Sequence, residues 1–111
     1  PNNLLNKLIK DELIKLGLSD KYVGFKYLTE LITNSLKSSF YTTKYIDFFE
    51  YVSRINLSPI DSIERAVRHM LSTTWKQNKE FRQTLRSKCQ IDKPNSKNLL
   101  NAIITHFKEF I

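Results

Sequence analysis

The sequence predicts an all-α fold of six helices, arranged as a single domain over residues 1–111. Only two glycines and three prolines occur in the 111 residues, which is too few for the many turns of a β-sandwich or a β-barrel. Apolar residues make up 41% of the chain and charged residues 26%, proportions typical of soluble proteins with a packed core. This length is the usual size of one domain, and no internal repeat or long linker divides it.

The first helix is predicted by apolar residues that recur at spacings of three and four. They are Leu4, Leu5, Leu8, Ile9, Leu13 and Leu16. Lysines and acidic residues lie between them, which is typical of an amphipathic helix with one buried face. Gly17 follows directly, and because glycine readily adopts the left-handed conformation that ends a helix, we expect the helix to stop there.

Two more helices are predicted over residues 22–38 and, more briefly, 45–52. Both carry bulky apolar side chains at helical spacing. The residues placed to cap them are Ser19 or Asp20 for the second helix and Thr42 or Thr43 for the third. Gly24 lies inside the second helix, where a glycine is best explained by another helix that packs closely.

The fourth helix has the clearest start signal in the chain. Ser58 suits the N-cap, Pro59 fits the first helical position, and Asp61 completes an S-x-x-D capping box. We expect this helix to run to about Trp75 or Lys76. Together with the third helix and the short turn between them, it has the outline of a helix-turn-helix over about residues 42–76.

The last two helices are predicted over residues 78–88 and 99–111. Phe81 and Leu85 anchor the fifth helix, and the segment 93–96 (K-P-N-S) breaks the chain before the sixth. The large aromatic residues expected in the core are Trp75, Phe81 and Phe107.

The net charge of +7 points to a polyanionic partner, and nucleic acid is the leading one. The excess is uneven. Residues 1–57 carry eight basic and six acidic groups, whereas residues 58–111 carry ten basic and five acidic groups. The basic half of the chain is therefore the half that begins with the fourth helix.

Several other function classes find no support in the sequence. The single Cys89 excludes an internal disulfide, and no apolar run is long enough to span a membrane, so we expect a cytoplasmic protein without membrane contact. His69, His106 and Cys89 lack metal-ligand spacing, and there is no glycine-rich phosphate loop. We therefore expect no metal, no cofactor, no small-molecule substrate and no enzymatic activity.

The fourth helix separates into an apolar and a polar face when its residues are placed at 100° intervals. The apolar stripe consists of Ile60, Ile63, Val67, Met70 and Leu71. The opposite face has Arg65 and Ser72 at its centre, Ser62 and His69 on one edge, and Asp61 and Arg68 on the other. Arginine can donate a bidentate pair of hydrogen bonds to guanine, and serine and histidine can bond phosphates or base edges. The helix N-terminus near Ser58 favours a phosphate.

Two residues of this helix keep alternative interpretations. Glu64 lies at the border of the apolar stripe, so an ion pair with Arg68 four residues later is favoured over a hydrogen bond from a cytosine amine. His69 is either an ordinary exposed or capping histidine or a phosphate contact.

Residues 63–69 (I-E-R-A-V-R-H), followed by Trp75, resemble the V-E-R-A-I-R-H…W recognition helix of the effector-domain family of stage-zero sporulation protein A, a response regulator of spore-forming Firmicutes. Further similar segments are 16–18 (L-G-L), 24–28 (G-F-K-Y-L), 43–44 (T-K) and 93–96 (K-P-N-S). The resemblance implies a six-helix domain that binds short boxes on double-stranded DNA through its helix-turn-helix, often as tandem copies, and regulates the transcription of sporulation genes.

The resemblance also implies roles for individual residues. Glu64 and Arg65 match base-reading positions of the family, and Arg68, His69 and Lys44 match positions at or near the phosphate backbone. Ser62 departs from the family, which has arginine there, and this change removes a base contact worth about 1–3 kcal/mol of discrimination. We therefore expect a different operator or weaker binding.

Two hypotheses for the function follow. The first is a sequence-specific, DNA-binding transcription regulator whose base-reading candidates are Arg65, Glu64 and Ser62 and whose phosphate contacts are Ser58, Arg68, His69 and Lys44. The alternative is a protein-interaction module of the same fold, which modulates such a regulator without reading DNA specifically.

Overall fold

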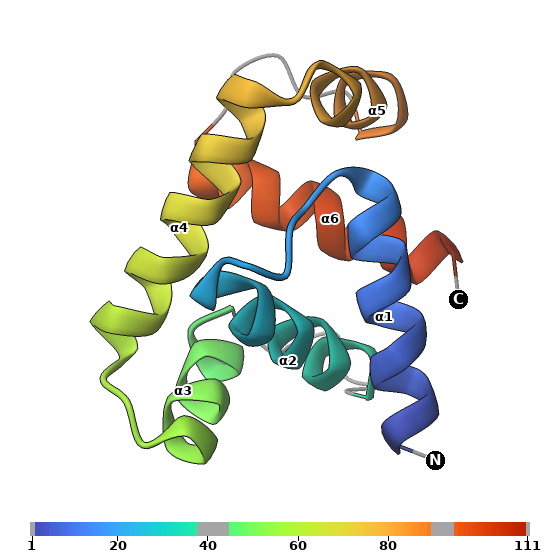
Figure 1. Ribbon diagram of the computed structural model, residues 1–111. Coiled ribbons are helices and arrows are strands. Elements are labelled where there is room, and N and C mark those ends of the chain that lie inside the picture. The colour runs from blue at the N-terminus through green and yellow to red at the C-terminus, as the bar shows by residue number, and fades with distance from the viewer. Residues whose placement is uncertain (1, 38–44, 90–94, 111) are drawn as a thin grey trace.

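The computed structural model describes residues 2–37, 45–89 and 95–110 (Figure 1). In these ranges the chain forms six α-helices and no strand. The helices are α1 (Asn2–Leu16), α2 (Val23–Lys37), α3 (Tyr45–Asn56), α4 (Ile60–Gln77), α5 (Lys79–Cys89) and α6 (Ser96–Phe110). The predicted all-α, six-helix fold is confirmed, while the expected caps Thr42 and Thr43 lie outside the described residues.

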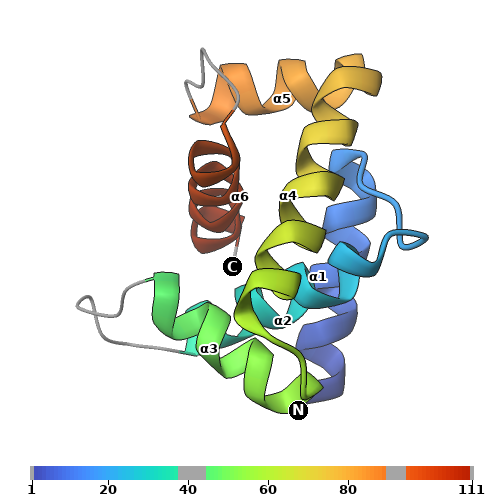
Figure 2. The same cartoon turned by 90° about the vertical axis from the view of Figure 1, so that its left-hand side faces the viewer.

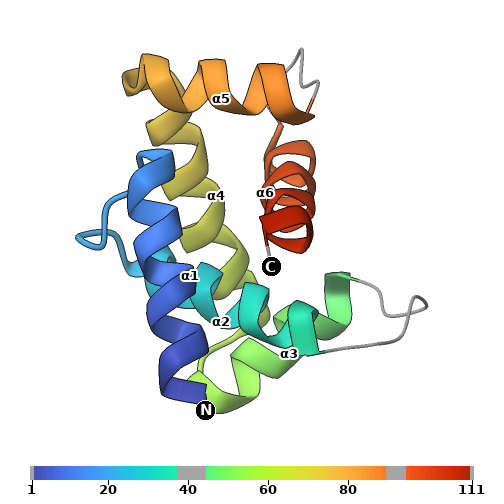
Figure 3. The ribbon, with the colours of Figure 1, turned by 90° about the vertical axis from the view of Figure 1, so that its right-hand side faces the viewer.

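Helix α2 lies at the centre of the fold and packs against α1, α3, α4 and α6. Helix α5 crosses one end of the molecule and contacts α1, α4 and α6 (Figure 3). All six helices contribute to one apolar core, whose largest fully buried side chains are Phe81, Phe107, Ile9, Leu13, Leu28, Leu31, Ile32, Ile63, Met70, Leu71, Leu85 and Leu99. Trp75 is also buried, so the expected placement of the three large aromatic residues is confirmed. None of the helices in the described ranges has the length and apolar character needed to cross a membrane.

Gly17 ends α1 as predicted. Its φ is 112°, and its N–H donates to the carbonyl of Ile14 at 3.0 Å, which is the geometry of a glycine-terminated helix. A Cβ atom at this position would also lie 2.6 Å from Nδ2 of Asn78. Asn78 in turn caps α5, because its Oδ1 accepts a hydrogen bond from the Phe81 N–H at 2.9 Å. The end of α1 therefore fits directly against the start of α5.

The expected cap of α2 is wrong. The helix begins at Val23, so neither Ser19 nor Asp20 is its N-cap. Ser19 instead forms a turn, in which its Oγ accepts from the Lys21 N–H at 3.2 Å and its carbonyl accepts from the Tyr22 N–H at 3.4 Å. A serine hydroxyl used in such a local turn is no longer available to cap a helix.

The turn between α3 and α4 contains a residue in the left-handed conformation that is not a glycine. Leu57 has a φ of 51°, and its side chain is 93% exposed. The Leu57 N–H donates to the Arg54 carbonyl at 3.4 Å, and the Ser58 N–H donates to the Ser53 carbonyl at 3.2 Å, which is the pattern of a Schellman motif. The Ser58 carbonyl also accepts a hydrogen bond from the Ser53 hydroxyl.

This turn explains why the predicted capping box of α4 is wrong. Ser58 is used to close α3, and Pro59 takes the N-cap position with φ −60° and ψ 147°. No side-chain hydrogen bond caps the helix, so Asp61 does not complete a box with Ser58. The Pro59 carbonyl instead accepts the first bonds of α4, from the N–H groups of Ser62 at 3.0 Å and Ile63 at 3.2 Å. The helix itself lies where it was predicted, within one or two residues at each end.

Candidate nucleic-acid interface

Helix α4 presents one long polar face to solvent. Figure 2 shows the helix between α6 on one side and the α1–α2 junction (residues 17–22) on the other. Its buried residues are Ile63, Val67, Met70, Leu71, Thr74 and Trp75, so the predicted apolar stripe is confirmed except at Ile60, which is half-buried. The exposed residues of the opposite face are Asp61, Ser62, Arg65, Arg68 and His69, and Ser72 is half-buried. Arg65 lies at the middle of this face.

Gly24 determines how closely α4 approaches α2. A Cβ atom on Gly24 would lie 2.5 Å from the carbonyl oxygen and 2.9 Å from the carbonyl carbon of Ala66. Both are backbone atoms of α4, so no side-chain movement could relieve the contact. The close helix packing expected at this glycine is confirmed, and it places the residues just before α2 beside one edge of the polar face.

That edge forms an open hollow of about 530 Å³, lined by Lys21, Tyr22, Val23, Gly24, Ser62, Arg65, Ala66 and His69. The lining includes two cationic side chains, Lys21 and Arg65, and no acidic one. The rings of Tyr22 and His69 meet edge to face, with their centroids 5.9 Å apart and their planes at 64°. We call this surface the α2-side hollow. Its charge and hydrogen-bonding groups are suited to an anion such as a phosphate.

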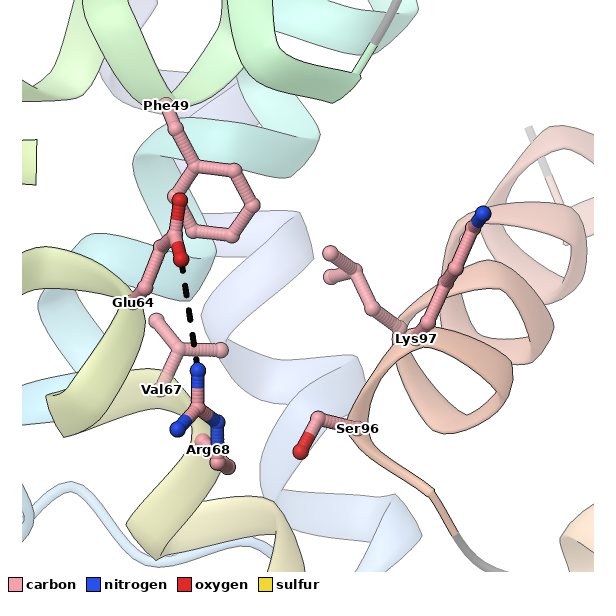
Figure 4. A pocket seen from close by; sticks show the side chains of 7 residues that line it. Phe49, Glu64, Val67, Arg68, Ser96 and Lys97 are labelled. Atoms are coloured by element: carbon pink, nitrogen blue, oxygen red, sulfur yellow. Dashed lines mark ion pairs between the residues drawn. The ribbon is translucent and has the colours of Figure 1, made fainter. Parts of the chain in front are cut away.

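The opposite edge of α4 borders a smaller, mainly apolar pocket of about 220 Å³ between α3, α4 and α6 (Figure 4). Glu64 and Arg68 lie at this pocket, with Arg68 Nη2 4.0 Å from Glu64 Oε2. This distance supports the ion pair favoured for Glu64. The Glu64 side chain is 34% exposed and the Arg68 side chain 58% exposed, so the pair contributes at most about 1 kcal/mol to stability. Either side chain can therefore turn toward a ligand.

Five of the seven predicted site residues lie on the exposed side of α4 or at its edges. Arg65 is central, Ser62 and His69 lie on the edge with the α2-side hollow, and Glu64 and Arg68 lie on the other edge. Ser58 lies half-buried in the turn before α4, and Lys44 lies outside the described residues. Lys21 and Tyr22 were not predicted, because they are about 40 residues away from α4 in sequence and reach it only through the contact of α2 with α4. The one local signal was Gly24.

The second histidine has a structural place. His106 is buried on α6, and its Nε2 lies 2.8 Å from Oε2 of Glu12 on α1. This pair links the first and last helices, away from the polar face of α4. Within the described ranges, no group of three His, Cys, Asp or Glu side chains could hold a metal ion.

A family model described as the C-terminal domain of sporulation initiation factor Spo0A matches residues 9–107 of the chain. The chain belongs to this family. The match covers all of α4 and the α1–α2 junction, and it confirms the resemblance found at residues 63–69. No curated protein and no solved structure matches the chain. As a Spo0A C-terminal domain, it is a DNA-binding effector domain of a sporulation regulator, and family membership places it among regulatory rather than catalytic domains.

Proposed function

We propose that this Spo0A-type domain is a sequence-specific transcription regulator that inserts α4 into the major groove of double-stranded DNA. The observation that carries the proposal is the position of Arg65 at the centre of an exposed polar face, on a helix held at backbone contact by α2. A major groove about 12 Å wide accommodates one α-helix, and a central arginine then faces the base edges. Arg65 is the principal base reader, through a bidentate pair of hydrogen bonds to guanine.

The neighbouring residues take roles that follow from their places around Arg65. Ser62 and Glu64 flank Arg65 near the N-terminal end of α4, so they contact adjacent base edges. To reach a base, Glu64 first leaves its weak ion pair with Arg68. Ser62 is short and reaches a base less well than the arginine of the family. Arg68 and His69 lie on the two edges and contact phosphates. Two further phosphate contacts are Ser58, in the turn of the helix-turn-helix before α4, and Lys44, near its start.

The test is an anisotropy titration with a duplex selected from a random pool and with an unselected duplex, each at several salt concentrations. The proposal predicts tighter binding to the selected duplex, with roughly 10³-fold or more preference at physiological salt. Equal, weak binding to both duplexes would instead favour the alternative, a protein-interaction module. Complete absence of salt-dependent binding would exclude DNA binding by the isolated domain altogether.

A second copy bound in tandem fits the dimensions of the domain. Its longest axis is 33 Å, and sites one helical turn apart on the same face of DNA are separated by roughly 34–36 Å. Two copies on such sites would therefore be close neighbours. We propose that duplexes with two boxes one turn apart bind two copies cooperatively. Inserting five base pairs between the boxes places the copies on opposite faces and should abolish the cooperativity.

A further inference from the structure

We propose that the α1–α2 junction is a second part of the DNA interface, in which Lys21 binds a backbone phosphate and Tyr22 positions His69 for the same strand. The proposal deepens the proposed function and rests on it. It concerns two residues that lie in no helix and that the recognition-helix pattern does not include.

Hydrogen bonds and a close backbone contact hold the junction beside α4. The Ser19 turn fixes the backbone of Lys21 and Tyr22 through two hydrogen bonds, of 3.2 and 3.4 Å. The Tyr22 carbonyl then accepts the Phe25 N–H at 3.1 Å, which joins the turn to the first residues of α2. Gly24 presses these residues against the backbone of α4. The exposed Lys21 side chain therefore lies at a defined place along the edge of the polar face of α4.

Phosphates must pass along this edge when α4 occupies a major groove. A helix with its side chains is about 10–12 Å across, and the groove is about 12 Å wide, so the two phosphate rows run along the flanks of the helix rather than over its centre. The α2-side hollow lies on one flank, carries Lys21 and Arg65, and has no acidic residue in its lining. A lysine there neutralises a phosphate while Arg65 remains directed at the bases.

Tyr22 acts through His69. Tyr22 is half-buried and packs against the apolar core. The ring that it contacts on its other side is that of His69, which is exposed. The edge-to-face contact at 5.9 Å restricts the rotation of the imidazole. A histidine already held in place loses less side-chain entropy when it binds a phosphate than a freely rotating one. Tyr22 is thus a positioning residue and Lys21 a direct contact.

Lys21→Gln tests the direct contact, with Lys10→Gln as the matched control. Both lysines are exposed, and Lys10 lies on α1, outside the lining of the α2-side hollow. Figure 3 shows α1 in front of α4. Loss of one phosphate contact lowers the slope of log K against log salt by about 0.9. The ratio of wild-type to Lys21→Gln affinity should therefore fall by about 3.5-fold between 50 and 200 mM salt, equally on selected and unselected duplexes. Lys10→Gln should leave the slope unchanged.

The positioning role is tested with a double-mutant cycle on Tyr22 and His69. Tyr22→Leu should weaken DNA binding several-fold in the wild-type background and have no further effect in a His69→Ala background, because its effect passes through the imidazole. Tyr22→Phe retains the ring and should bind like the wild type. Equal losses from Tyr22→Leu in both backgrounds would show that Tyr22 does not act through His69. Since Lys21→Gln changes only an exposed side chain, it remains informative if Tyr22→Leu fails to fold.

Failure of the proposed function and failure of the junction's role give different results. If the wild-type domain binds no DNA, the proposed function fails. If the wild type binds with a steep salt dependence but Lys21→Gln and Lys10→Gln have the same slope as the wild type, the phosphate contact of Lys21 is overturned and the proposed function is not.

Discussion

Gly24→Ala should destabilise the domain, although the same change stabilises an ordinary helix. At an unhindered interior position, alanine is better than glycine by about 1 kcal/mol. Here the added Cβ would lie 2.5 Å from the Ala66 carbonyl oxygen and 3.1 Å from Val67 Cα, so α2 and α4 must separate. Overpacking of this kind costs about 1–3 kcal/mol, or more where backbone must move. Because the contact is with backbone atoms, we expect the upper part of this range, about 2–3 kcal/mol. After the gain of about 1 kcal/mol in helix propensity, the net loss should be about 1–2 kcal/mol.

Urea denaturation of Gly24→Ala and the wild type measures this difference as a shift in midpoint at unchanged slope. Lys26→Ala, at an exposed position of the same helix, is the control for helix propensity and should leave stability within about 0.5 kcal/mol. Because the contact is with backbone, an additional Ala66→Gly change should not rescue the variant. A Gly24→Ala protein as stable as the wild type, or more stable, would refute the close approach of α2 and α4.

Three other predictions concern the core, the turn and the interface. Glu12→Gln and His106→Gln should each cost about 1–3 kcal/mol in urea denaturation, because each weakens or removes the 2.8 Å contact between Nε2 of His106 and Oε2 of Glu12, and a double-mutant cycle that shows no coupling would contradict the pair. Leu57→Gly should raise stability by up to about 1 kcal/mol, since a left-handed conformation costs a non-glycine residue about 1–2 kcal/mol and glycine returns part of this as chain entropy; a clear loss of stability would argue against the positive φ. Arg65→Ala should lower discrimination at one base position by about 1–3 kcal/mol in competition titrations, whereas Arg68→Ala should weaken binding to all sequences alike; the reverse pattern would exchange their roles.

The parts of the fold that depend on local periodicity could be predicted from the sequence. The buried stripe of α4 and the central exposure of Arg65 follow from a 3.6-residue repeat that the structure preserves. The end of α1 at Gly17 was also predictable, because few residues other than glycine adopt a φ of 112° without strain. These features require no knowledge of what the helices pack against.

Features that depend on competition between hydrogen bonds could not be predicted in this way. Ser19 and Ser58 both have the chemistry of an N-cap, yet Ser19 stabilises a turn before α2 and Ser58 helps to close α3. The role of Ser58 could not be predicted, because the left-handed residue of the α3–α4 turn is Leu57 and not the glycine that usually marks such a position.

The edges of the interface depend on tertiary contacts. Lys21 and Tyr22 reach the polar face of α4 only because α2 meets α4 at Gly24. The sequence indicated close packing at this glycine but not which helix packs on it. Glu64 could be placed at the border of the apolar stripe, but its 4.0 Å distance from Arg68 is a property of the folded chain.

We propose that α4 reads DNA sequence through Arg65. The most direct test compares the affinities for a selected duplex and for the same duplex with the guanine opposite Arg65 replaced. Both affinities are measured for the wild type and for Arg65→Ala at one salt concentration. The wild type should discriminate between the two duplexes by about 1–3 kcal/mol, whereas Arg65→Ala should not. Equal discrimination by both proteins would exclude base reading by Arg65.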